Sequence, residues 1–121
     1  MSSVRAIRGA ITTLTDTPEA IGDAVKELLR EMLERNSLVA EDVISVIFTA
    51  TTDLTSAFPA TAARSVGFGA VPLICASEIA VPSAMPRCIR VMMHVETNVE
   101  KAAIRHVYLR DAVTLRDDIA Q

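Results

Sequence analysis

The sequence lacks the short motifs that usually carry nucleophilic, metal or phosphate chemistry. It contains no glycine-rich phosphate loop, no serine nucleophile elbow and no HExxH zinc motif. Of its two histidines, His94 lies in an apolar run, where a structural role is the simpler interpretation, and His106 is open to either role. The two cysteines, Cys75 and Cys88, have no CxxC spacing, so we expect free thiols and neither a zinc nor a redox site. Nucleophilic and metal-dependent chemistry are therefore poorly supported.

A basic surface and long apolar runs are missing as well. The formal net charge is -3 and the isoelectric point is about 5.3, which argues against nucleic acid or an anionic membrane as a partner. The N-terminus has no basic region followed by an unbroken apolar stretch, and no window approaches the roughly 18 apolar residues of a membrane span. We therefore expect a cytoplasmic protein in which any anion site is local.

The composition and the residue pattern predict one α+β domain spanning residues 1–121. Hydrophobic residues make up 50% of the chain and charged residues 22%, a balance typical of packed globular proteins. Thr17 as N-cap, Pro18 at the first helical position and apolar residues at helical spacing predict a principal helix that ends near Asn36. Runs of β-branched and apolar residues predict strands at 4–13, 43–51, 71–76, 88–95 and 107–109, the second of them buried on both faces. Short helices are expected at 59–66 and 99–103, and a loose polar tail at the C-terminus.

Arginines give the first indication of function. The chain has ten arginines and two lysines, and most of the arginines lie outside the principal helix. Surface solvation explains many of them, but on alternating strands Arg8 and Arg90 share their faces with small or apolar residues. Such a charge must be paired or must line a cavity that admits an anion. Arg64 and Arg116 could add to the same site, and arginine forks suit a dicarboxylate ligand.

Several segments, in order and with nearly the family's spacing, resemble the monofunctional chorismate mutases, which form trimers of pseudo-α/β-barrel subunits. The segments that carry this resemblance are Arg5–Ala10, Thr52-Asp53-Leu54, Phe58-Pro59-Ala60, Cys88–Met93, Arg105–Leu109 and Leu115-Arg116. The resemblance implies a mixed β-sheet packed with one long helix and short helices. It also implies a homotrimer with sites at subunit interfaces and a Claisen-type rearrangement of chorismate to prephenate in phenylalanine and tyrosine biosynthesis, without a cofactor.

The resemblance also implies roles for individual residues. Arg90 would contact the ether oxygen of chorismate, Glu78 would bind the ring hydroxyl, and Arg8 with Tyr108 would bind a carboxylate. Phe58, Ala60 and Arg64 would come from the neighbouring subunit, Cys75 would lie near the ring hydroxyl, and Leu115 with Arg116 would belong to a mobile tail, roughly residues 112–121, that covers the pocket. The full set of implied substrate-binding residues is Phe58, Ala60, Arg64, Leu73, Ile74, Cys75, Tyr108, Leu115 and Arg116.

Two positions depart from the family pattern. Thr61 stands where some members have lysine, so one contact with the substrate is absent or is replaced by Arg64, and Ile74 stands where threonine can occur. A regular strand would point Cys75 and Glu78 to opposite faces, so the strand must end or bulge between them if both meet the ring.

Two other functions remain open at this stage. An imine hydrolase of the Rid type has a similar trimeric fold and also places an arginine against a carboxylate, and fold alone does not separate functions. A non-enzymatic module that binds small carboxylates is the second alternative. The Cys-Ile-Arg-Val and His-Val-Tyr-Leu segments favour the mutase.

Overall fold

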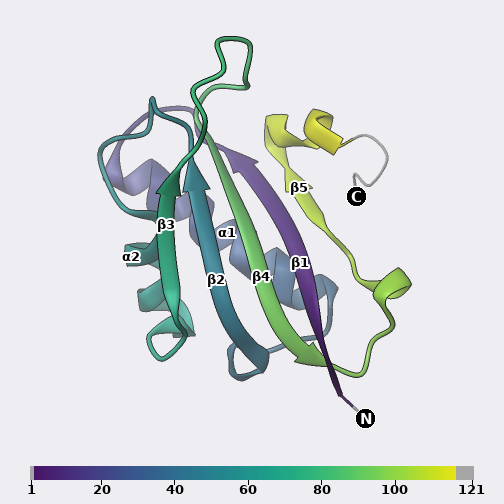
Figure 1. Cartoon of the computed structure of the whole chain (residues 1–121). Coiled ribbons are helices and arrows are strands. Elements are labelled where there is room, and N and C mark those ends of the chain that lie inside the picture. The colour runs from purple at the N-terminus through teal and green to yellow at the C-terminus, as the bar shows by residue number, and fades with distance from the viewer. Residues whose placement is uncertain (1, 117–121) are drawn as a thin grey trace.

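A single mixed β-sheet, backed by helices on one face, forms the framework of the chain (Figure 1). The computed structural model describes residues 2–116. Its strands are β1 (Ser3–Thr12), β2 (Val43–Ala50), β3 (Leu73–Ser77), β4 (Cys88–Thr97) and β5 (Val107–Leu109), in the spatial order β3-β2-β4-β1-β5. The central strand β4 runs antiparallel to β1 and β2, whereas the outer pairs β2–β3 and β1–β5 are parallel. The predicted α+β class and mixed sheet are confirmed.

Helix α1 (Pro18–Arg35) begins and ends where the sequence predicts. The side-chain oxygen of Thr17 accepts a hydrogen bond from the backbone N–H of Ala20 at 3.1 Å, and Pro18 occupies the first turn. Its buried residues face the sheet: Ile21, Ala24, Val25, Leu28, Leu29 and Met32. At Gly9 of β1 an added Cβ would lie 2.5 Å from the sulfur of Met32, so the missing side chain lets the helix approach the sheet closely.

Buried Asn36 joins the end of α1 to the segment before β5. Its side-chain amide donates to the carbonyl oxygens of Met32 and Arg105, at 2.8 and 2.9 Å, and accepts the backbone N–H of Arg105 at 2.8 Å. Every polar atom of the amide group is thereby used, as burial requires. The contact helps to fix the chain as it enters β5.

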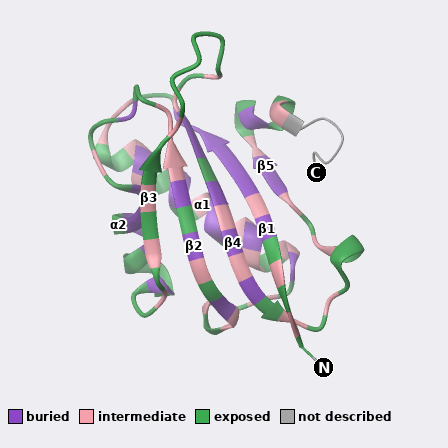
Figure 2. Cartoon of the chain, in the orientation of Figure 1, coloured by how far each residue is buried: buried purple, intermediate pink, exposed green. Residues whose placement is uncertain are grey.

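Helix α1 covers one face of the sheet, whereas among the described residues the other face is covered only at one end, where Ala112 packs on Ala10, Cys88 and Tyr108. Figure 2 shows buried residues alternating with half-buried or exposed ones along β2 and β4. The covered face supplies the core residues Ile7, Ile11, Val46, Phe48, Ile89, Val91, Met93 and Val95. On the other face, here called the open face, Ile47 is 40% exposed and Ile74 is 62% exposed. The prediction that β2 is buried on both faces is therefore wrong for a single chain, because the helices pack on one side only.

Strand ends differ from the predicted ones by one or two residues, and two helical segments differ more. The short helix expected at 59–66 is α2 (Pro59–Ala63), which continues into the wider turn Arg64–Phe68, where Gly67 has φ of 103° and interrupts the regular helix. The expected loose tail is a 3₁₀ helix over Arg110–Arg116, and Ala112 within it is buried. Residues 117–121 of that tail lie outside the described residues.

Shorter 3₁₀ turns cover Ala40–Asp42 and Lys101–Ala103. No helix within residues 2–116 is long and apolar enough to cross a membrane.

Candidate functional site

The open face brings together Arg8 from β1 and Arg90 from β4. In the antiparallel pair of β1 and β4, Arg8 lies opposite Met92 and Ala10 lies opposite Arg90, so both arginines project from the same face. They border a cavity of about 230 Å³ lined by Arg8, Gly9, Ile47, Thr49, Arg90, Val91, Met92 and Tyr108. The open face thus places two permanent cations and the side chain of Tyr108 around one small cavity, an arrangement suited to carboxylates.

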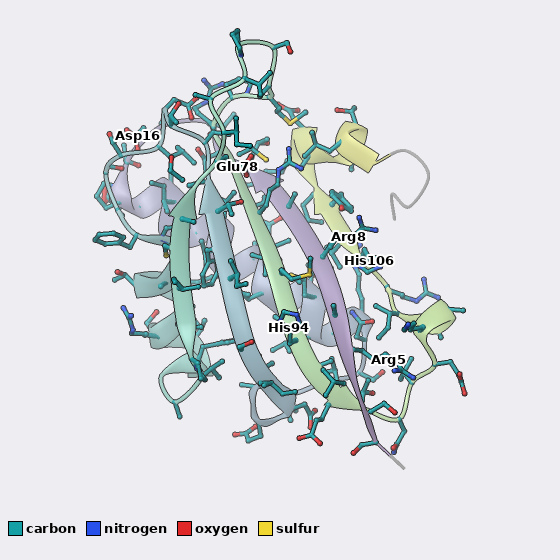
Figure 3. The ribbon with its side chains drawn as sticks, in the orientation of Figure 1. Arg5, Arg8, Asp16, Glu78, His94 and His106 are labelled. Carbon is teal, nitrogen blue, oxygen red and sulfur yellow. The ribbon has the colours of Figure 1, made fainter. Side chains whose placement is uncertain are left out.

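Glu78 lies beside Arg90 at the end of β3. Its backbone N–H donates to the carbonyl of Ala50 at 3.0 Å, which prolongs the pairing of β3 with β2 by one residue. Its Oε2 lies 3.2 Å from Nε of Arg90 and accepts a hydrogen bond from the hydroxyl of Thr49 at 2.8 Å. Figure 3 shows Glu78 near one end of the sheet and Arg8 farther along β1. Glu78 therefore contacts two residues that line the cavity, Arg90 and Thr49, while Arg8 lines it from β1.

His106 supports the backbone beside Arg8. Its Nδ1 accepts the backbone N–H of Arg8 at 2.9 Å, immediately before β5 begins to pair with β1 at Gly9. Figure 3 shows His106 next to Arg8, whereas His94 lies lower on β4, with its Nδ1 3.4 Å from the hydroxyl of Ser45. Neither histidine lines the cavity between Arg8 and Arg90. Both contacts fit supporting roles better than proton transfer to a ligand in that cavity.

A second cavity lies on the opposite side of the β2–β3 edge. It has a volume of about 490 Å³ and is lined by residues 50–52, 54–59 and 75–77, with Phe58 72% exposed beside it. Cys75 pairs in register with Phe48 and faces the core side, whereas Ile74 pairs with Ile47 on the open face. Strand β3 stays regular to Ser77, so Cys75 and Glu78 point to opposite faces and do not meet within one chain.

Asp16 anchors the loop that carries Phe58. Its carboxylate accepts four hydrogen bonds, from the backbone N–H and the hydroxyl of both Thr55 and Ser56, at 2.7 to 3.1 Å. The hydroxyl of Ser56, followed by the other three donors, lowers the pKa of Asp16 against the opposing effect of desolvation. Because the pKa is lowered on folding, these bonds are fully present at neutral pH and are lost only in strong acid.

The remaining residues implied by the resemblance are scattered within one chain. Ala60 is buried in the main core and Leu73 is half-buried against it. Arg64 follows α2, which packs against α1 on the helical side, so it does not join Arg8 and Arg90. Leu115 packs against the small cluster of Ala10, Cys88, Tyr108 and Ala112, and the side chain of Arg116 lies outside the described part.

The two thiols do not behave as a reactive pair. Both Cys75 and Cys88 are free, as predicted. Burial raises the pKa of the Cys88 thiol to about 11, so this group stays protonated at neutral pH. Across residues 2–116 no cluster of three or more potential ligands could hold a metal ion.

Thr49 and Asp16 were not among the residues that the sequence pattern indicated. Alternation along the strand at 43–51 places Thr49 on the face of Ile47, but only the pairing of β2 with β4 puts it beside Arg90. For Asp16, the neighbouring residues in the sequence give no sign of its distant partners at 55 and 56.

Comparisons with known proteins cover almost the whole chain. The family model described as chorismate mutase type I matches residues 4–119. The chain is 55% identical over 117 residues to chorismate mutase AroH of Thermus thermophilus, with 96% of each protein covered. It is 44% identical over 118 residues to chorismate mutase AroH of Bacillus subtilis, covering 97% of this chain and 93% of the relative. A solved chorismate mutase from Clostridium thermocellum superposes with a TM-score of 0.87 at 50% identity, covering 88% of this chain and 96% of that one. Arg8, Thr49, Glu78, Arg90 and Tyr108 lie within the matched range.

Proposed function

Because the chain belongs to the chorismate mutase type I family, it is an isomerase that converts chorismate to prephenate, and we propose that it does so through fixed arginines in a site shared between subunits. The family match favours this reaction over imine hydrolysis and over simple carboxylate binding. The observation that carries the proposed mechanism is the open-face cavity, which Arg8, Arg90 and Tyr108 border with Glu78 paired to Arg90.

The chemistry needs positioning and charge rather than proton transfer. Chorismate is a dianion, and its rearrangement breaks a carbon–oxygen bond while a carbon–carbon bond forms, so negative charge gathers on the ether oxygen. In our proposal Arg8 and Tyr108 bind a carboxylate and hold the compact conformer. Arg90 supplies a preorganised cation where the charge develops, which stabilises the transition state more than the bound substrate.

Glu78 and Arg90 act as a unit in this mechanism. The Nε of Arg90 is engaged with Glu78, whereas the terminal guanidinium nitrogens make no hydrogen bond to any residue from 2 to 116. We propose that these terminal nitrogens bind the ether oxygen. Glu78 accepts a hydrogen bond from the ring hydroxyl of chorismate. Its negative charge also complements the positive charge that spreads over the ring.

The geometry of one chain supports a site completed by a neighbour. The open-face cavity measures about 230 Å³, below the roughly 300–1,000 Å³ of typical ligand pockets. Phe58, Arg64 and Cys75 lie on the other side of the β3 edge, where they serve a neighbouring chain more readily than their own. Exposed Ile47, Ile74 and Phe58 would be covered in such a contact. We propose a homotrimer, in which three such heterologous contacts close into a ring.

The C-terminal helix fits the same proposal. Leu115 packs against the cluster that contains Tyr108, which places the 3₁₀ helix beside the proposed carboxylate site. Leu115 and Arg116 would then cover bound chorismate on that side.

The mass of the protein in solution tests the shared site. We expect light scattering to give three times the chain mass of 13.0 kDa, at protein concentrations used for the activity assay. The loss of chorismate absorbance, measured on the same sample, reports activity. A stable monomer with full activity would show that one chain holds the complete site and would contradict the proposal.

A further inference from the structure

Thr49 lines the cavity beside the ion pair of Glu78 and Arg90. It is the direct cross-strand neighbour of Arg90 in the pairing of β2 with β4, and both side chains project from the open face. Its hydroxyl donates to Oε2 of Glu78 at 2.8 Å, and the same oxygen lies 3.2 Å from Nε of Arg90. One carboxylate oxygen thus has two partners from two different strands.

The other carboxylate oxygen of Glu78 is left for a ligand. Within residues 2–116, Oε1 accepts no hydrogen bond. The side chain of Glu78 is 15% exposed, and no buried side-chain oxygen or nitrogen of the described residues lacks a partner, so Oε1 remains accessible. An accessible carboxylate oxygen that accepts no hydrogen bond from the described residues is a suitable acceptor for a substrate hydroxyl.

Without the hydroxyl of Thr49, Glu78 and Arg90 could pair in a different geometry. Arginine and carboxylate groups tend to form a fork with two parallel hydrogen bonds. In this structure Arg90 and Glu78 form an ion pair through Nε and Oε2 without such a fork, and the hydroxyl of Thr49 donates to the same Oε2. If the carboxylate turned to form a fork with Nε and the adjacent terminal nitrogen of Arg90, both of its oxygens and that nitrogen would be withdrawn from the substrate.

We propose that Thr49 is a positioning residue for this reaction. Its hydroxyl holds Glu78 in the orientation that presents Oε1 to the ring hydroxyl of chorismate and keeps the terminal nitrogens of Arg90 available. This inference rests on the role given above to Glu78.

Variants of matched shape separate the hydroxyl from the methyl group of Thr49. Thr49→Val keeps the branched shape and removes the donor, and we expect kcat/KM for chorismate to fall about tenfold, equal to about 1.4 kcal/mol. Thr49→Ser keeps the donor and should retain activity within about twofold. Ser45→Ala removes a hydroxyl from the same face of β2, outside the cavity, and serves as the control with unchanged activity.

A double-mutant cycle tests whether Thr49 acts through Glu78. We expect Thr49→Val to add less than about a twofold loss when Glu78 is already alanine, because the group it positions is gone. A loss of full size in the Glu78→Ala background would mean that Thr49 acts independently and would overturn the inference, as would normal activity of Thr49→Val. Normal activity of Glu78→Ala alone would instead show that the role proposed for Glu78 is wrong. Thermal unfolding of each variant distinguishes loss of fold from loss of positioning.

Discussion

Replacing Arg90 by alanine is expected to lower kcat at least about 100-fold while the protein stays folded and associated. Removing one preorganised donor at a site of developing negative charge typically costs about 3–4 kcal/mol. The same change also takes from Glu78 its only cationic partner among the described residues, so part of the loss reflects a disturbed carboxylate. The loss should appear mainly in kcat, because the interaction is strongest in the transition state.

Arg90→Lys is expected to give a kcat between those of the native protein and of Arg90→Ala. It keeps the positive charge, but it lacks the planar fork that, in our proposal, contacts Glu78 and the ether oxygen at the same time. Arg30→Ala, on the exposed surface of α1, is the control for loss of a guanidinium group and should leave kcat unchanged. Initial rates of chorismate loss, with circular dichroism as the check on folding, make the comparison. Near-normal turnover in Arg90→Ala would mean that another residue stabilises the ether oxygen.

Two impaired variants are expected to restore activity when their subunits are mixed. Arg90→Ala damages the open-face part of the site, and Arg64→Ala damages the part that we assign to the neighbouring chain. We expect Arg64→Ala alone to lower kcat/KM at least about tenfold through loss of a charge-assisted contact. A mixed trimer has one interface at which both parts are native, so random mixing should recover about a quarter of the native activity.

The recovered activity depends on exchange of subunits between the two variants. It also depends on whether the Arg64 and the Arg90 of one site come from different chains. Co-refolding from denaturant, or co-expression with two different affinity tags, produces the mixed trimers, and each variant refolded alone is the control. If Arg64 and Arg90 of the same chain contribute to the same site, every site in a mixed trimer lacks one of these two arginines. Activity equal to the sum of the separate variants would therefore contradict a site shared between subunits.

Local features of the fold could be predicted from the sequence, whereas features that depend on distant contacts could not. The cap at Thr17 and the helical spacing up to Met32 are local, and α1 follows them closely. The burial of β2 was predicted wrongly because an apolar β-branched run does not show how many of its faces are covered. The C-terminal 3₁₀ helix was missed because the small side chain of Ala112 is buried by contacts with β1, β4 and β5.

The same distinction applies to the site. Arg8 and Arg90 could be recognised because strand alternation places each among small or apolar residues, and the cavity between them agrees with that reasoning. Thr49 could not be recognised, because its importance comes from the register of β2 against β4 and from a carboxylate 29 residues away in the sequence. The pairing of Asp16 with the loop before Phe58 is equally non-local.

The central claim is that fixed charges and substrate positioning carry the rearrangement without proton transfer. Measuring kcat for chorismate in ordinary and in heavy water, from about pH 6 to about pH 9, tests this claim most directly. The account predicts a nearly flat profile and a solvent isotope effect close to one, because arginines stay charged throughout this range. A slow product release would add only the small viscosity effect of heavy water. A steep bell centred near neutral pH together with a large solvent isotope effect would show general acid–base catalysis and would contradict the account.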